Sequence, residues 1–163
     1  MAESLEKRVE QLDKSLRALR NRLAEQDNDR RREVQGLRFG MGAGALAGTL
    51  FALTVAVWGQ SQDSDEVYTL WSLVPAGWFG IVTLVLVLLT GVGTIGAVVG
   101  APERATHIAM VVLSLVTAAA VLFVSSAVGV EGADGPGRWF TLVVAVVLAM
   151  LHGIRAEDLH ASR

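Results

Sequence analysis

Four stretches of this chain contain no Asp, Glu, Lys or Arg, and they cover residues 39–58, 76–100, 108–130 and 139–154. A helix on the surface of a soluble domain keeps one charged, hydrated face, so such stretches are not expected in a soluble fold. An apolar run of about 18 residues is long enough to cross the hydrocarbon core of a bilayer as a helix. The first three stretches exceed that length and the fourth approaches it. They predict an all-α membrane protein containing a bundle of four transmembrane helices.

The fourth stretch is flanked by groups that can lengthen it, because Arg138 can extend its side chain to the membrane surface and His152 lies near the other end. Outside the stretches, only residues 1–38 form a soluble segment long enough to fold. We therefore expect three parts, which are an N-terminal segment (1–38), a transmembrane bundle (39–154) and a short tail (155–163). The first apolar stretch follows 38 residues of charged sequence, so it is expected to be an uncleaved anchor rather than a signal peptide.

Positive charge is distributed unevenly, since ten of the 14 Lys and Arg residues precede Phe39. Basic segments stay on the cytoplasmic side, which places the N-terminus there. The connections at 59–75 and 131–138 are acidic on balance and are expected outside, whereas Arg104 and the tail are expected inside. Both termini are then cytoplasmic. Twelve of the 14 basic residues are Arg, and Ala, Val and Gly are abundant, so we expect a bacterial inner-membrane protein from a GC-rich genome.

Apolar residues in the N-terminal segment recur at alternating spacings of four and three, which is the heptad pattern of a coiled coil. We call these residues the leucine seam: Leu5, Val9, Leu12, Leu16, Leu19 and Leu23. The remaining positions are nearly all polar, so no wide apolar face exists to cover a globular core. The seam predicts a cytoplasmic coiled-coil helix through which the chain forms a homo-oligomer. The alternatives are a helix that lies on the membrane and one that folds back on its own bundle.

The charges beside the seam favour a parallel dimer. In that arrangement each residue just before an a position faces the residue five positions later in the partner. The facing pairs are Arg8 with Asp13, Ser15 with Arg20 and Arg22 with Asp27. Two pairs attract and none repels. Exposed ion pairs contribute only a few tenths of a kcal/mol, so they select the orientation while the apolar residues supply the stability.

Small residues on the spans indicate close packing between helices. Gly40, Gly44 and Gly48 share one face of the first span, where they allow another helix to approach closely. That helix is either the first span of a second copy or another span of the same chain. Gly96 and Gly100 continue a glycine-rich second span, which indicates either helix packing or an unwound stretch that lines a cavity.

Basic residues border the first span at Arg30, Arg31, Arg32 and Arg38. Acidic residues are interleaved with them and no aromatic residue accompanies them, which argues against nucleic acid as a partner. We expect them to contact anionic lipid. Aromatic residues near the outer ends of the spans predict an interfacial belt, formed by Trp58, Tyr68, Trp71, Trp78, Phe79, Trp139 and Phe140.

No site for catalysis can be assembled from the spans, because they contain no carboxylate and no nucleophile with a base. The absence of cysteine excludes disulfides and thiolate metal sites. His107 and His152 share no helical spacing, and both are expected at the membrane interface. Hydroxyl residues of the second and third spans are expected to form hydrogen bonds between helices. We therefore expect no enzymatic activity, no cofactor and no metal.

The sequence as a whole favours a self-associating scaffold, adaptor or accessory subunit of a larger membrane complex. One alternative is a small pore or transporter component, such as a holin-like protein or a channel subunit, based on the glycine-rich second span. Another is a sensor, based on the acidic and aromatic loop that includes Asp63, Asp65 and Glu66.

Overall fold

The structure is a computed structural model, and it describes residues 2–60, 67–100, 103–128 and 135–161. For residues 2–9, 32, 60, 125 and 128 it describes the backbone alone. The described residues contain four helices long and apolar enough to cross a membrane, which confirms the prediction of a helical chain with four candidate spans. The chain divides into two compact units, an N-terminal unit (Met1–Arg38) and a bundle unit (Phe39–Arg163), and each is described by itself.

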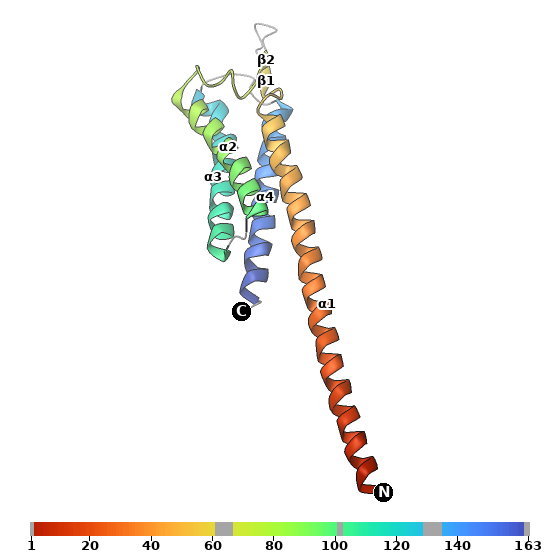
Figure 1. Ribbon diagram of the computed structural model, residues 1–163. Helices are drawn as coiled ribbons and strands as arrows, with labels where there is room; N and C mark the ends of the chain where they lie inside the picture. The colour runs from red at the N-terminus through yellow and green to blue at the C-terminus, as the bar shows by residue number, and fades with distance from the viewer. Residues whose placement is uncertain (1, 61–66, 101–102, 129–134, 162–163) are drawn as a thin grey trace. The chain divides into compact units, whose positions relative to one another are not determined.

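Helix α1 covers Ala2–Leu53 and contributes to both units (Figure 1). Residues 1–35 contain neither proline nor glycine, so nothing in this part interrupts the helix. In the N-terminal unit the described side chains of α1 are almost all exposed. In the bundle unit α1 buries one face, formed by Ala43, Ala47 and Leu50, each with no exposed surface.

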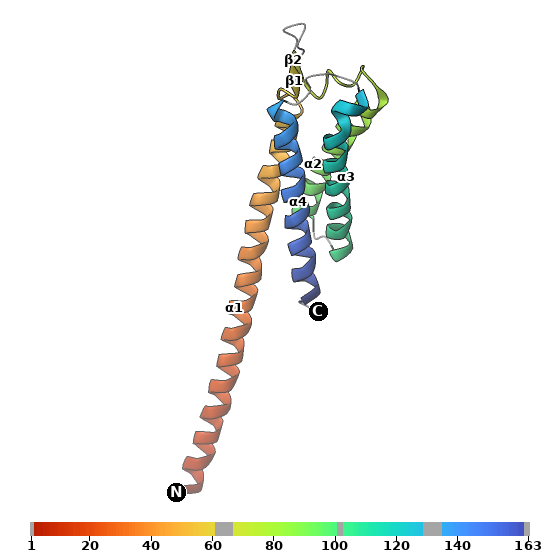
Figure 2. The ribbon, with the colours of Figure 1, turned by 180° about the vertical axis from the view of Figure 1, so that it is seen from behind.

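Three further helices complete the bundle unit, which are α2 (Trp78–Val99), α3 (Arg104–Val128) and α4 (Pro136–Ala161). Helix α3 packs against both α4 and α2 (Figure 2). Pro136 occupies the first position of α4, where the missing N–H group costs nothing. Helix α4 continues to Ala161, so the predicted tail at 155–163 is largely helical. The charge-free stretch marked the apolar part of this helix and not its end.

The first predicted span also ends differently, because α1 stops at Leu53 rather than at residue 58. The indole Nε1 of Trp58 donates a hydrogen bond to the Leu53 carbonyl at 2.7 Å, which satisfies one of the carbonyls left free at the end of a helix. The chain then forms a two-stranded antiparallel sheet that the sequence did not predict. Strand β1 (Gly59–Gln60) pairs with β2 (Val67–Tyr68), and Gly59 lies opposite Tyr68.

Trp58 departs from the predicted interfacial belt, because its side chain has no exposed surface. The start of α4 lies directly against it: the Gly135 N–H donates to the Trp58 carbonyl and the Gly137 N–H donates to the Val57 carbonyl, both at 2.8 Å. A Cβ atom at position 137 would lie only 2.7 Å from the Val57 oxygen. Trp58 is therefore part of the core that joins α1 to α4.

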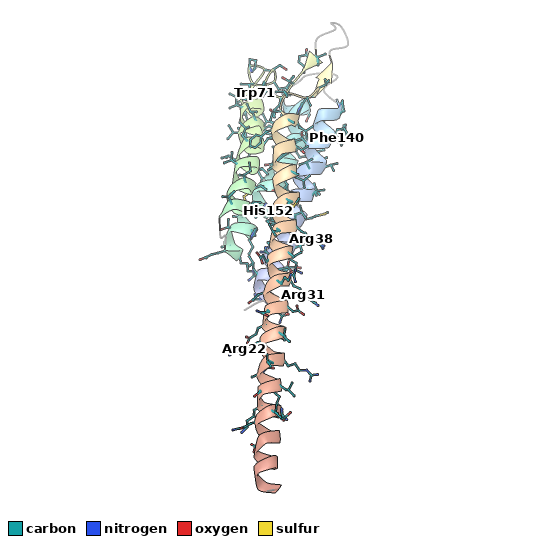
Figure 3. The ribbon with its side chains drawn as sticks, turned by 45° about the vertical axis from the view of Figure 1, so that its right-hand side comes forward. Arg22, Arg31, Arg38, Trp71, Phe140 and His152 are labelled. Carbon is teal, nitrogen blue, oxygen red and sulfur yellow. The ribbon has the colours of Figure 1, made fainter. Side chains whose placement is uncertain are left out.

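Other aromatic residues of the predicted belt remain on the surface, with Trp71, Trp78, Trp139 and Phe140 all exposed. Figure 3 shows Trp71 and Phe140 toward the end of the bundle that carries the β1–β2 sheet, and His152 toward the other end. Trp71 and Phe140 therefore lie toward the same end of the bundle (Figure 3).

Candidate functional site

The described part of the bundle brings two histidine rings together. The Nδ1 atoms of His107 on α3 and His152 on α4 lie 2.9 Å apart, which is a hydrogen-bond distance. On the other side of the ring, the Nε2 atom of His152 lies 3.3 Å from the Thr94 hydroxyl of α2. His107 retains 1% of its exposure, and His152 and Thr94 retain none. We call these three residues the histidine cluster.

An aromatic ring from α1 covers the histidine cluster. Phe39 meets His107 edge to face at 5.4 Å between ring centroids, and meets His152 in the same way at 5.5 Å. The guanidinium of Arg155 on α4 lies 5.9 Å from the centre of the Phe39 ring. All four helices therefore contribute a side chain at this place.

The sequence did not predict this pairing of the two histidines. Helix α3 begins at Arg104, before the predicted stretch, so His107 is already inside the helix and on the face toward α4. The two residues are far apart in sequence, and no helical spacing relates them. Only the packing of α3 on α4 reveals their contact.

Hydroxyl groups form a second polar contact within the bundle, as the sequence predicted. The hydroxyls of Thr90 on α2 and Thr117 on α3 lie 2.7 Å apart, and both side chains are fully buried. Thr117 also donates to the Leu113 carbonyl of its own helix at 2.9 Å, which leaves Thr90 to donate to Thr117. Ser114 lies on the same helix, and its buried Oγ has no hydrogen-bond partner among the described atoms.

We expect Thr90→Val to destabilise the bundle by about 0.6 kcal/mol, and by no more than about 1.7 kcal/mol, the range measured for hydrogen bonds between membrane helices. Valine keeps the shape of the side chain and removes only the hydroxyl. Unfolding in mixed detergent micelles provides the measurement. The control is Thr49→Val, whose exposed hydroxyl bonds only the Ala45 carbonyl of its own helix. An equal loss in both variants would show that Thr90–Thr117 contributes nothing between helices.

Arg138 does not extend to the surface as the sequence suggested, because only 8% of the residue is exposed. Its Nε donates to the Val121 carbonyl at 3.2 Å and its Nη2 donates to the Leu122 carbonyl at 2.6 Å. The guanidinium also lies 5.3 Å from the Trp139 ring. Arg138 thus attaches the start of α4 to the backbone of α3, and its buried charge is hydrogen-bonded.

The described members of the leucine seam lie on the surface of the N-terminal unit. Leu12, Leu16, Leu19 and Leu23 are each between 57% and 63% exposed. The side chains of Leu5 and Val9 lie outside the described residues. Asp13, beside the seam, forms an ion pair with Arg17 one turn later at 2.7 Å. The structure therefore places a row of apolar side chains along a helix whose own unit leaves them uncovered.

The predicted packing glycines divide into two groups. A Cβ atom at Gly40 would lie 3.3 Å from the Val98 side chain of α2, so this glycine accommodates a neighbouring helix. No atom lies within 4 Å of that position at Gly44, Gly48 or Gly96, while at Gly100 the neighbour is the Gly96 carbonyl. Two further glycines of the glycine-rich second span are in closer contact: a Cβ at Gly91 would meet the Phe51 ring, and one at Gly93 would meet the Met110 sulfur, each at 2.8 Å.

The predicted lipid-contacting residues Arg30, Arg31 and Arg38 are exposed and line a shallow surface hollow of the N-terminal unit with Asp27, Val34 and Gln35. The side chain of Arg32 lies outside the described residues. Figure 3 shows Arg22, Arg31 and Arg38 at successive levels of α1.

Comparisons with known proteins identify no relative, since no family model, no curated protein and no solved structure matches this chain. Among the described residues, no group of three or more His, Cys, Asp or Glu side chains is placed to hold a metal ion.

Proposed function

We propose that this chain is a non-enzymatic protein of the bacterial inner membrane that self-associates through its leucine seam. It serves as a scaffold, adaptor or accessory subunit of a larger assembly. The observation that carries the proposal is the exposure of Leu12, Leu16, Leu19 and Leu23 on one long helix. A row of leucines at heptad spacing gains about 0.8 kcal/mol for each methylene group that a partner removes from water. The described N-terminal unit contains helix α1 alone, so nothing within that unit covers these leucines.

Charge supports a second copy of the same chain as the partner. Arg22 and Asp27 attract across a parallel pair, and no facing pair in that arrangement carries like charges. The two ion pairs of the described helix, Lys14 with Glu10 and Arg17 with Asp13, connect residues one turn apart on its surface. Two copies anchored in the same membrane also emerge from it in the same direction, and this favours the parallel dimer.

The distribution of charge supports an orientation with both termini in the cytoplasm. Four spans return the chain to the side from which it started, in agreement with the basic residues at both ends. Arg30, Arg31 and Arg38 are exposed next to the first span, where they attract anionic headgroups.

Two observations bear on the pore and sensor alternatives. Gly91 and Gly93 of α2 lie against the Phe51 and Met110 side chains, and Thr117 of α3 bonds Thr90. These residues therefore participate in helix packing, which favours a closed bundle over a lined pathway. The acidic loop on which the sensor alternative depends lies outside the described residues.

The proposal is tested by measuring the mass of the full-length chain extracted in mild detergent, together with any proteins that purify with it. We expect a dimer at micromolar concentration and at least one membrane or cytoplasmic partner in stoichiometric amount. A chain that stays monomeric at every concentration would contradict self-association. A dimer that purifies alone would retain self-association but contradict the scaffold role.

A separate prediction concerns the open glycine face of α1. Gly48→Leu is expected to leave the fold intact, because no atom lies within 4 Å of the new Cβ. If the first spans of two copies meet through Gly44 and Gly48, the added bulk weakens the dimer several-fold. Gly42→Leu is the control, since its position is equally open but lies on another face of the helix. The measurement is the dimer dissociation constant of each variant in detergent. Equal values for Gly48→Leu and Gly42→Leu would exclude a role for the glycine face.

A further inference from the structure

The histidine cluster is an unusual feature for a membrane-spanning bundle. Ionisable side chains are rare inside transmembrane helices and commonly mark functional sites, because burying their charged form is costly. His107 and His152 lie within helices α3 and α4 and are almost completely buried. The scaffold function gives them no role, since the leucine seam lies in the other unit.

The contact between the two rings depends on the number of protons. An Nδ1 to Nδ1 distance of 2.9 Å requires one hydrogen between the two nitrogens, with one ring as donor and the other as acceptor. When Nδ1 of His152 carries that hydrogen in the neutral pair, Nε2 of His152 is unprotonated. This nitrogen then accepts a hydrogen bond from the Thr94 hydroxyl. Both Nδ1 atoms and His152 Nε2 then have a hydrogen-bond partner.

One additional proton fits the same geometry. When it binds His152 Nε2, that nitrogen becomes a donor to the Thr94 oxygen, and the contact with His107 becomes a charge-assisted hydrogen bond. A second additional proton does not fit. It occupies the lone pair of His107 Nδ1, and two N–H groups then face each other at a distance where one hydrogen is required.

We propose that the His107–His152 pair is a buried proton-binding site. It takes up one proton beyond its neutral state and keeps the hydrogen bond between the rings, whereas a second added proton separates α3 from α4. Both protons come from water and occupy nitrogen lone pairs, so no other reactant is needed. This site goes beyond the proposed scaffold function and does not depend on it.

Each neighbouring helix contributes a group near the histidine pair, and one of these groups is charged. Helix α1 contributes the phenyl ring of Phe39 and α2 contributes the hydroxyl of Thr94, and neither titrates. Helix α4 contributes Arg155, whose guanidinium lies 5.9 Å from the centre of the Phe39 ring and acts electrostatically on His107. Its fixed positive charge adds to the repulsion that a doubly protonated pair experiences. Phe39 touches both rings, so movement of the pair is transmitted to α1.

The chain has three histidines, which makes the site directly observable. The full-length protein, labelled with ¹⁵N at its histidine rings and reconstituted in lipid nanodiscs, is titrated across the ordinary imidazole pKa of about 6.5. We expect a nitrogen–nitrogen coupling across the His107–His152 hydrogen bond that disappears at acidic pH. His160, exposed near the end of α4, is the single-ring reference. Two rings that titrate independently with no coupling at any pH would overturn the proposal.

A second experiment measures the helices themselves. The chain contains no cysteine, so spin labels can be placed at Val112 of α3 and Met150 of α4, both on the exposed surface. We expect the distance between the labels to increase on acidification, and the increase to be lost in His107→Gln, which bonds but does not titrate. His160→Gln is the matched control and should retain it. A distance that does not change in the native chain, or a change that persists in His107→Gln, would overturn the proposal.

Discussion

Replacing Leu12, Leu16 and Leu19 together with alanine is expected to convert the protein from a dimer to a monomer. Roughly 60% of each leucine is exposed and therefore available to a partner. Each substitution is expected to lower the favourable free energy of apolar burial in the dimer by about 1.5 kcal/mol per copy. Six truncated side chains then remove about as much free energy as a micromolar association supplies, which is about 8 kcal/mol. Alanine is the best helix former, so α1 itself should persist. Sedimentation equilibrium in density-matched detergent measures the change.

The matched control for this variant changes the same helix away from the seam. The control substitutions are Gln11→Ala, Lys14→Ala and Asn21→Ala, at exposed positions on the opposite side of the heptad. We expect this triple variant to remain dimeric. Dissociation in both variants would mean that charge or general helix stability, and not the leucine seam, holds the copies together.

Gly80→Ala is expected to cause the largest loss of stability in the bundle unit, about 3 kcal/mol. The new Cβ would overlap the Leu73 carbonyl oxygen and lie 2.8 Å from its carbon, and backbone atoms cannot move aside as a side chain can. The neighbouring segment is held in place because Leu70 and Leu73 are buried in the core. Denaturation in mixed micelles, followed through tryptophan fluorescence, gives the difference in the free energy of unfolding.

Gly77→Ala is the control for that substitution, three residues earlier at the start of α2. Its backbone is extended, with φ of 171°, and no atom lies within 4 Å of the Cβ position. We expect a change within about 0.5 kcal/mol. Equal stabilities for the two variants would show that the segment before α2 does not pack as described.

The helical part of the fold was predictable because membrane spans obey a simple rule of composition. Burying charge in hydrocarbon is costly, so charge-free stretches identify the spans without knowledge of their neighbours. The ends of the helices were less predictable. Helix α4 continues past Ile154 through Arg155 and Glu157, since a helix can leave the membrane without a change in its backbone. Helix α1 ends before Trp58, because the indole bonds the Leu53 carbonyl and the chain joins a short sheet.

The candidate site was not predictable in the same way. His107 and His152 carry no shared periodicity, and their contact exists only because α3 and α4 pack side by side. The charge of Arg138 indicated a residue that extends to the surface, yet its guanidinium finds carbonyl partners at Val121 and Leu122. Such contacts between distant segments are fixed by tertiary packing, which one sequence does not reveal. The exposed leucine seam, in contrast, is a local pattern on one helix and could be identified from spacing alone.

Cysteine cross-linking at the leucine seam tests self-association most directly, because the native chain has no cysteine to interfere. Single variants Leu12→Cys and Leu19→Cys are oxidised mildly in the native membrane, beside the outward-facing controls Lys14→Cys and Asn21→Cys. A parallel dimer predicts rapid disulfide-linked dimers at positions 12 and 19 and few at positions 14 and 21. Absence of cross-links at every seam position, or equal cross-linking at the control positions, would contradict self-association through the leucine seam.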